Sequence, residues 1–125
     1  MREIDKGHRF ILNSYDGPYG CELQFMKREG KGYPGNEGHY PGTNCQEVMR
    51  ALITRIIYLN WQESCLTNKI SIWLLRVIIW LFEYRAARRH NVYPVWKLHN
   101  IEKLATCPTC GHIKCNHGTL SCTSH

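Results

Sequence analysis

The apolar stretch from residue 70 to residue 82 places the strongest constraint on how this chain can fold. It reads Ile-Ser-Ile-Trp-Leu-Leu-Arg-Val-Ile-Ile-Trp-Leu-Phe, so a helix here would be apolar in nearly every direction. It is too short to span a membrane, which needs roughly 20 apolar residues, and Arg76 interrupts it. We therefore expect a buried helix with no membrane partner. A soluble chain must cover the remaining apolar surface with copies of itself or with another protein, and of these we predict a homo-oligomer built on the hairpin.

A second helix is predicted before this stretch. Thr43 and Gln46 have the spacing of a capping box, and Glu47 suits the first turn of a helix. Apolar side chains then recur every three or four residues, which predicts an amphipathic helix over about 44–61.

The two predicted helices are separated by a short turn. Thr67 or Asn68 is expected to cap the apolar helix, which extends to about residue 90 because Pro94 prevents much continuation. Two helices joined by so short a loop form an antiparallel hairpin.

The N-terminal part of the chain has the character of β-structure. Residues 10–12 are apolar, and residues 21–26 alternate between apolar and polar side chains after a cluster of turn-forming residues, which predicts an antiparallel pair. The predicted fold is therefore α+β. A small antiparallel sheet and glycine-rich loop occupy residues 1–42, a long two-helix hairpin occupies 43–92, and a short cysteine- and histidine-rich tail occupies 93–125.

Three arginines near the end of the apolar helix are the first candidates for ligand binding. Arg85, Arg88 and Arg89 are spaced by three and four residues, which places them on neighbouring positions of one helix surface. Such cations also suit the negative end of a helix dipole, which is the purely structural interpretation. The functional interpretation is that planar guanidinium groups match phosphate oxygens in pairs. The net charge of +6 also favours an anionic partner.

Tyr58 and Asn68 are candidates at the other end of the hairpin. An aromatic ring can stack on a base and an amide can hydrogen-bond to its edge, although a core position and a helix cap are the structural alternatives. Asn68 and Arg85 are 17 positions apart, and they are separated by roughly 25 Å along a helix. If both serve one small ligand, that site must lie between protomers.

The helical half of the chain resembles phage anti-Thoeris signal sponges. The resemblance covers roughly residues 8–91, and its specific part is residues 41–53 (Pro-Gly-Thr-Asn-Cys-Gln-Glu-Val-Met-Arg-Ala-Leu-Ile) with residues 68–70, 75–76 and 81–87. Proteins of that family are non-enzymatic. They bind a cyclic ADP-ribose isomer, the glyco-cyclised messenger of Thoeris defence, in the cytoplasm of the infected bacterial host.

The resemblance implies roles for individual residues. Tyr58, at a position that is often phenylalanine in the family, and Asn68 would lie near the adenine, and Arg85 and Arg89 would hold the pyrophosphate. It also implies a dimer or a trimer of dimers. Some related sponges bind cyclic di- or trinucleotides of CBASS systems at a separate site, to which no residue of this chain is assigned.

The cysteines of the tail form a second pattern. Cys107 and Cys110, followed by glycine, have the spacing of a zinc knuckle. The third and fourth ligands of a four-ligand site could come from among three further side chains: Cys115, His117 and Cys122. No apolar leader follows Met1, so we expect reduced thiols or metal ligands and no disulfide framework. Structural zinc is predicted, with free thiols or a disordered tail as the alternative. A redox pair is disfavoured because no βαβ pattern precedes the motif.

Two other functions compete with the sponge. A zinc-ribbon nucleic-acid-binding protein would fit the charge and the knuckle, but it should spread its cations over a groove-sized face. A phosphoesterase would need a catalytic constellation, and the sequence contains no P-loop, G-x-S-x-G or H-E-x-x-H motif. The sequence therefore favours a sponge over a nucleic-acid-binding protein and over an enzyme, and no cofactor is required.

Overall fold

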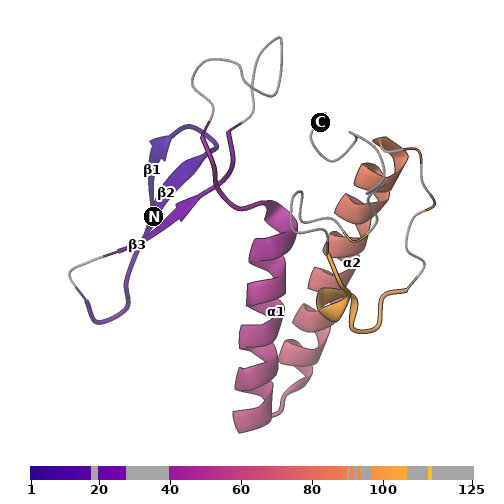
Figure 1. Ribbon diagram of the computed structural model, residues 1–125. Helices are drawn as coiled ribbons and strands as arrows, with labels where there is room; N and C mark the ends of the chain where they lie inside the picture. Colours follow the sequence, from indigo (N-terminus) through magenta and orange to yellow (C-terminus); the bar gives the residue numbers. More distant parts are fainter. Residues whose placement is uncertain are drawn as a thin grey trace. The chain divides into compact units, whose positions relative to one another are not determined.

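The computed structural model describes residues 1–17, 20–27, 40–89, 91, 93, 97–106 and 113. The chain divides into two compact units, Met1–Cys45 and Gln46–His125. The first contains a three-stranded sheet and the second contains two long helices, which confirms the predicted α+β class (Figure 1).

The sheet is a simple antiparallel meander. Its strands are β1 (Arg2–Asp5), β2 (Arg9–Leu12) and β3 (Cys21–Gln24), in the order β1-β2-β3. Phe10 of β2 pairs with Leu23 of β3, and its ring meets the ring of Phe25 edge-on at a centroid distance of 5.9 Å. The predicted pairing of residues 10–12 with the segment 21–26 is thus confirmed, and β1 is a strand that the sequence did not indicate.

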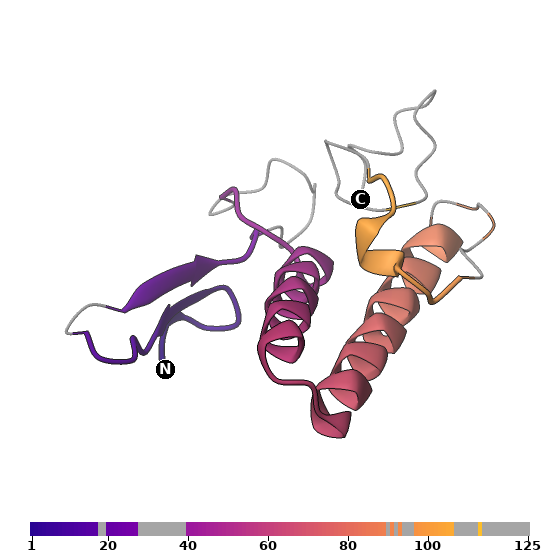
Figure 2. The ribbon, with the colours of Figure 1, turned by 90° about the horizontal axis from the view of Figure 1, so that it is seen from below.

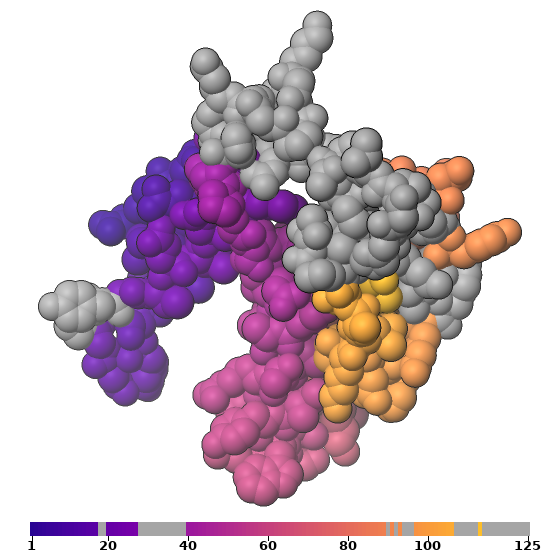
Figure 3. Space-filling view, in the orientation of Figure 1, coloured from indigo at the N-terminus to yellow at the C-terminus, as the bar shows by residue number. Residues whose placement is uncertain are grey.

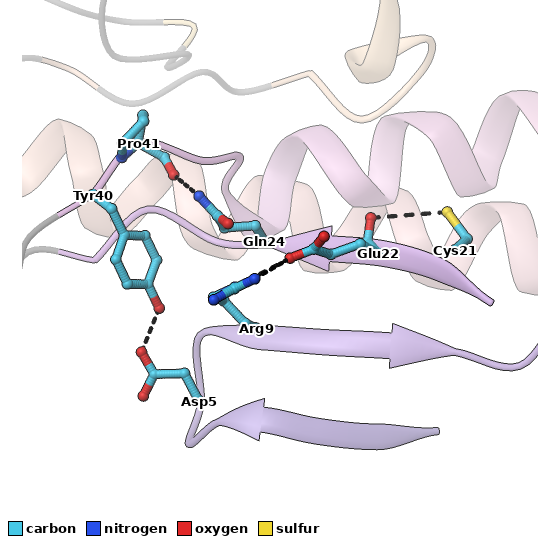
Figure 4. A network of polar contacts seen from close by, with 7 residues as sticks. All are labelled: Asp5, Arg9, Cys21, Glu22, Gln24, Tyr40 and Pro41. Carbon is cyan, nitrogen blue, oxygen red and sulfur yellow. Dashed lines mark hydrogen bonds and ion pairs between the residues drawn. The ribbon is translucent and has the colours of Figure 1, made fainter. Parts of the chain in front are cut away.

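The segment that precedes the helices returns to β3. The Thr43 N–H donates to the Gln24 carbonyl and the Met26 N–H to the Thr43 carbonyl, both at 2.9 Å. The side chain of Gln24 also donates to the Pro41 carbonyl at 2.5 Å (Figure 4). A Cβ at Gly42 would lie 2.5 Å from the Phe25 carbonyl carbon, so only glycine allows this close approach.

Helices α1 (Cys45–Gln62) and α2 (Leu66–Arg89) form the predicted hairpin, and they run antiparallel beside each other (Figures 1 and 2). The predicted cap is wrong: α2 begins at Leu66, so Thr67 and Asn68 already belong to the helix. The Cys65 carbonyl accepts from the Lys69 N–H at 3.3 Å, and the Cys65 N–H donates to the Asn60 side chain at 3.1 Å. A side chain from α1 therefore organises the turn.

The core of the second unit joins three elements. It contains Met49 and Ile53 of α1, Ile72 and Ile79 of α2, and Ile101 of the 3-10 helix η1 (Ile101–Lys103). Because Ile101 is fully buried, part of the segment that the sequence assigned to the tail belongs to the hairpin core.

An ion pair fixes η1 against α2. The guanidinium of Arg76 donates to both carboxylate oxygens of Glu102, at 2.8 and 3.0 Å, and to the Asn100 side chain at 3.2 Å. Burial by itself would raise the pKa of Glu102, but the hydrogen bonds from Arg76 and the backbone outweigh it and hold that pKa below its usual value. In Figure 3 the orange surface of this segment lies against the hairpin.

Much of the apolar surface of the hairpin stays exposed in the single chain. Ile70, Trp73, Leu74 and Leu81 of α2 are all about half exposed, and Trp61 of α1 is 82% exposed. Neither of the two described helices is long and apolar enough to cross a membrane.

Candidate functional site

The three predicted arginines lie in the last two turns of α2, and all are exposed. The guanidinium carbon of Arg85 lies 4.9 Å from the ring centroid of Phe82, and that of Arg88 lies 5.9 Å from the ring centroid of Tyr84. Such cation–π contacts hold each guanidinium group against the neighbouring aromatic ring. Within the described part of the chain none of the three forms an ion pair with a carboxylate.

Tyr84 belongs to a larger aromatic surface beside these arginines. Its ring stacks on that of Trp80, with a centroid distance of 5.4 Å and an interplanar angle of 26°. Arg88, Tyr84 and Trp80 therefore form a continuous cation–aromatic row along α2. Trp80 and Tyr84 were not among the residues predicted from the sequence, although the spacing of four residues from Trp80 to Tyr84 and on to Arg88 is visible there.

Tyr58 and Asn68 lie at the opposite, turn end of the hairpin. The Tyr58 ring is half exposed, with Arg55 at 5.6 Å from its centroid and Trp61 at 6.5 Å, and its hydroxyl accepts from Gln62 at 3.2 Å. The Asn68 amide donates weakly to the Glu63 carbonyl at 3.5 Å. Tyr58 is thus a surface residue and is not a core filler.

The predicted ligand-binding residues therefore fall into two groups in one chain. Asn68 and Arg85 are in the same helix, 17 positions apart, which is roughly 25 Å at the helical rise. A single hairpin does not bring the two groups to one small ligand.

The predicted metal ligands lie outside the described residues. These are Cys107, Cys110, Cys115, His117 and Cys122. In the part of the chain that the structure describes, no group of three or more histidine, cysteine or acidic side chains is placed to hold a metal ion.

A buried charged pair between the helices was not anticipated from the sequence. Arg50 of α1 donates to Glu83 of α2 at 3.1 Å, and the side chain of Glu83 is only 2% exposed. The other carboxylate oxygen of Glu83 accepts the Ile113 N–H at 2.9 Å. Burial raises the pKa of Glu83, although the contacts with Ile113 and Arg50 oppose the shift. Since the pair lies inside the hairpin, we interpret it as structural.

A second polar cluster is found in the N-terminal unit. Asp5 accepts from the Tyr40 hydroxyl at 2.5 Å and from Lys27 at 3.2 Å (Figure 4 shows the contact with Tyr40). The hydrogen bond from Tyr40, followed by that from Lys27, lowers the pKa of Asp5. Figure 4 also shows the ion pair between Arg9 of β2 and Glu22 of β3, in which a guanidinium nitrogen lies 2.6 Å from a carboxylate oxygen.

This cluster predicts an acid-sensitive contact. Tyr40→Phe removes the leading hydrogen bond, so the pKa of Asp5 should rise toward its ordinary value of 3.8. The wild-type contact stabilises the folded unit above that value and is lost as the pH falls through the lowered folded pKa. An NMR titration of the Asp5 carboxyl carbon measures both values. Tyr15→Phe, at a 92% exposed tyrosine, is the control, and an equal Asp5 pKa in wild type and Tyr40→Phe would contradict the assignment.

The N-terminal unit also has an open hollow of about 560 Å³. It is lined by residues of β1, β2 and the following turn, including Arg2, Leu12 and Ser14. None of the predicted ligand-binding residues lines it, and Arg2 is the one arginine or lysine among its described lining residues. We therefore place the candidate anion site at the end of α2.

The chain was also compared with known proteins. No protein-family model, curated protein or solved structure matches it. A functional proposal therefore depends on the residues and the geometry described above.

Proposed function

We propose that this protein is a non-catalytic sponge that binds the glyco-cyclised ADP-ribose messenger and withholds it from Thoeris defence in the infected bacterial cytoplasm. The observation that carries the proposal is the exposed arginine group at the end of α2, which has no paired carboxylate among the described residues. The resemblance of residues 41–53 and of parts of α2 to anti-Thoeris sponges suggests which anion would bind there. Arg85 and Arg89 would bind the pyrophosphate, with Arg88 beside them.

The turn end of the hairpin would supply the base-binding part of the site. Tyr58 offers a half-exposed aromatic face and Asn68 an amide, which suit stacking on adenine and hydrogen bonding to its edge. Because the two groups are far apart in one chain, the proposal requires a homo-oligomer, a dimer or a trimer of dimers, in which one copy completes the site of another.

Sequestration needs no chemical step. A sponge lowers the free messenger by mass action when its sites outnumber the messenger and its affinity is high. Stable guanidinium–phosphate pairs serve that purpose, since such pairs are among the stronger hydrogen bonds in proteins.

The direct test is a calorimetric titration of the purified full-length protein with the glyco-cyclised ADP-ribose isomer. The bound ligand is then released by heat and examined by chromatography. Saturable binding with intact ligand supports the sponge. Altered ligand would make the protein an enzyme, and absence of binding would overturn the proposal and direct the same assay to cyclic di- and trinucleotides.

The competing nucleic-acid function makes different predictions. A nucleic-acid-binding protein would bind duplex or single-stranded probes with an affinity that falls steeply as salt rises. Zinc in the tail, which stays a prediction, is tested separately by metal analysis of the protein and of a Cys107→Ser/Cys110→Ser variant.

A further inference from the structure

The outward face of α2 carries apolar residues at a heptad spacing. Ile70, Leu74, Val77, Leu81 and Tyr84 follow one another at steps of four, three, four and three residues, and we call these residues the α2 seam. Ile70, Leu74 and Leu81 are 48%, 49% and 52% exposed, and Val77 and Tyr84 are half-buried.

The seam is distinct from the face of α2 that fills the hairpin core. That inner face holds the buried residues Ile72, Ile79, Glu83, Ala86 and Ala87. Two further exposed apolar residues, Trp73 and Ile78, flank the seam. A stripe that repeats every 3.5 residues matches the surface of another helix, since alternating steps of three and four let side chains insert between those of a partner helix.

We propose that the α2 seam packs antiparallel against the α2 seam of a second copy of this chain. The register is centred between Leu74 and Val77, so that Leu74 packs opposite Val77 of the partner subunit and Ile70 opposite Leu81 of the partner subunit. The inference rests on the homo-oligomer of the proposed function and names the interface that forms it.

The charges along α2 select the antiparallel direction. In a parallel pair, Arg88 would lie opposite Arg88 of the partner subunit at the next position of the same seam, which is repulsive. In the antiparallel register Arg88 lies opposite the partner's hairpin turn, where Glu63 is exposed. Twofold symmetry repeats this opposite-charge contact at both ends of the interface.

The same register has a consequence for the ligand. It brings the arginine-bearing end of one α2 level with the turn end of the other, so that Arg85 lies opposite Leu66 of the partner subunit. The two separate groups of candidate residues then occupy the same end of the paired hairpins.

Sedimentation velocity without ligand tests the interface independently of messenger binding. We expect a concentration-dependent dimer for the wild type and a dimer dissociation constant raised on the order of a hundredfold by Leu74→Asp, which places a charge in the apolar seam. Leu52→Asp on α1 is a matched control, because Leu52 is 45% exposed and lies outside the seam. A monomeric wild type, or dissociation by the control alone, would overturn the proposal.

A charge exchange tests the direction of packing. Arg88→Glu and Glu63→Arg should each weaken the dimer about tenfold, because each turns two attractive contacts into two repulsive ones. The double variant should regain wild-type association. A parallel dimer would show no rescue, and that outcome would overturn the antiparallel register. A dimer that behaves as expected but does not bind messenger would refute the sponge and leave this interface standing.

Discussion

Replacement of Glu83 by alanine is expected to lower the free energy of unfolding by about 3–5 kcal/mol. The carboxylate is 2% exposed, it pairs with Arg50 across the hairpin, and it accepts the Ile113 N–H. Its loss leaves the buried guanidinium of Arg50 without its buried counter-charge. Urea unfolding followed by circular dichroism at neutral pH measures the effect.

Glu47→Ala is the matched control for this prediction. Glu47 also pairs with Arg50, at 3.0 Å, but its side chain is 58% exposed, so its removal should cost less than about 1 kcal/mol. A double variant, Arg50→Met/Glu83→Leu, should recover most of the loss, since apolar side chains of similar size often replace a buried pair without penalty. Equal effects of Glu83→Ala and Glu47→Ala would contradict the central role of Glu83.

Arg85→Ala and Arg89→Ala are each expected to weaken binding of the cyclic ADP-ribose isomer by about 2 kcal/mol, or about thirtyfold in Kd. Each substitution removes a charge-assisted contact with the pyrophosphate. Arg85 is exposed and its guanidinium lies over Phe82, so the substitution should leave the fold unchanged. Calorimetric titration of each variant gives the change in affinity.

Two control variants separate specific binding from the effect of total charge. Lys103→Ala removes one exposed positive charge from η1 and should leave the affinity nearly unchanged. Arg85→Lys keeps the charge but loses the planar pair of donors, and it should bind with intermediate affinity. Unchanged affinity in both alanine variants would remove these two arginines from the site.

The helices were predictable because their signals are local. A period of three to four residues indicated α1 and its ends to within one residue, and Pro94 limited α2. Strand β1 was not predictable in this way. It contains a single apolar residue, Ile4, and it exists because its backbone pairs with β2. The start of α2 was misassigned because the Asn60 side chain, from the preceding helix, organises the turn at Cys65.

In the candidate site, too, residues that are close in sequence were predictable and contacts between distant residues were not. Arg85, Arg88 and Arg89 are neighbours in sequence, so their grouping followed from helical spacing. Arg50 and Glu83 are 33 positions apart and meet only because the hairpin closes. Arg76 was noticed only as an interruption of the apolar stretch, and its partner Glu102 could not be inferred without the position of η1.

Because Ile101 belongs to the hairpin core, that core can be completed only late in synthesis of the chain. The sheet unit, Met1–Cys45, precedes the helices in the chain and therefore leaves the ribosome first. The helices emerge next, but their shared core lacks Ile101 and the Arg76–Glu102 contact until the chain has grown past residue 102. The nascent hairpin is therefore incomplete during that interval, and a chain arrested before residue 101 would lack the contribution of Ile101 to the core formed by Met49, Ile53, Ile72 and Ile79.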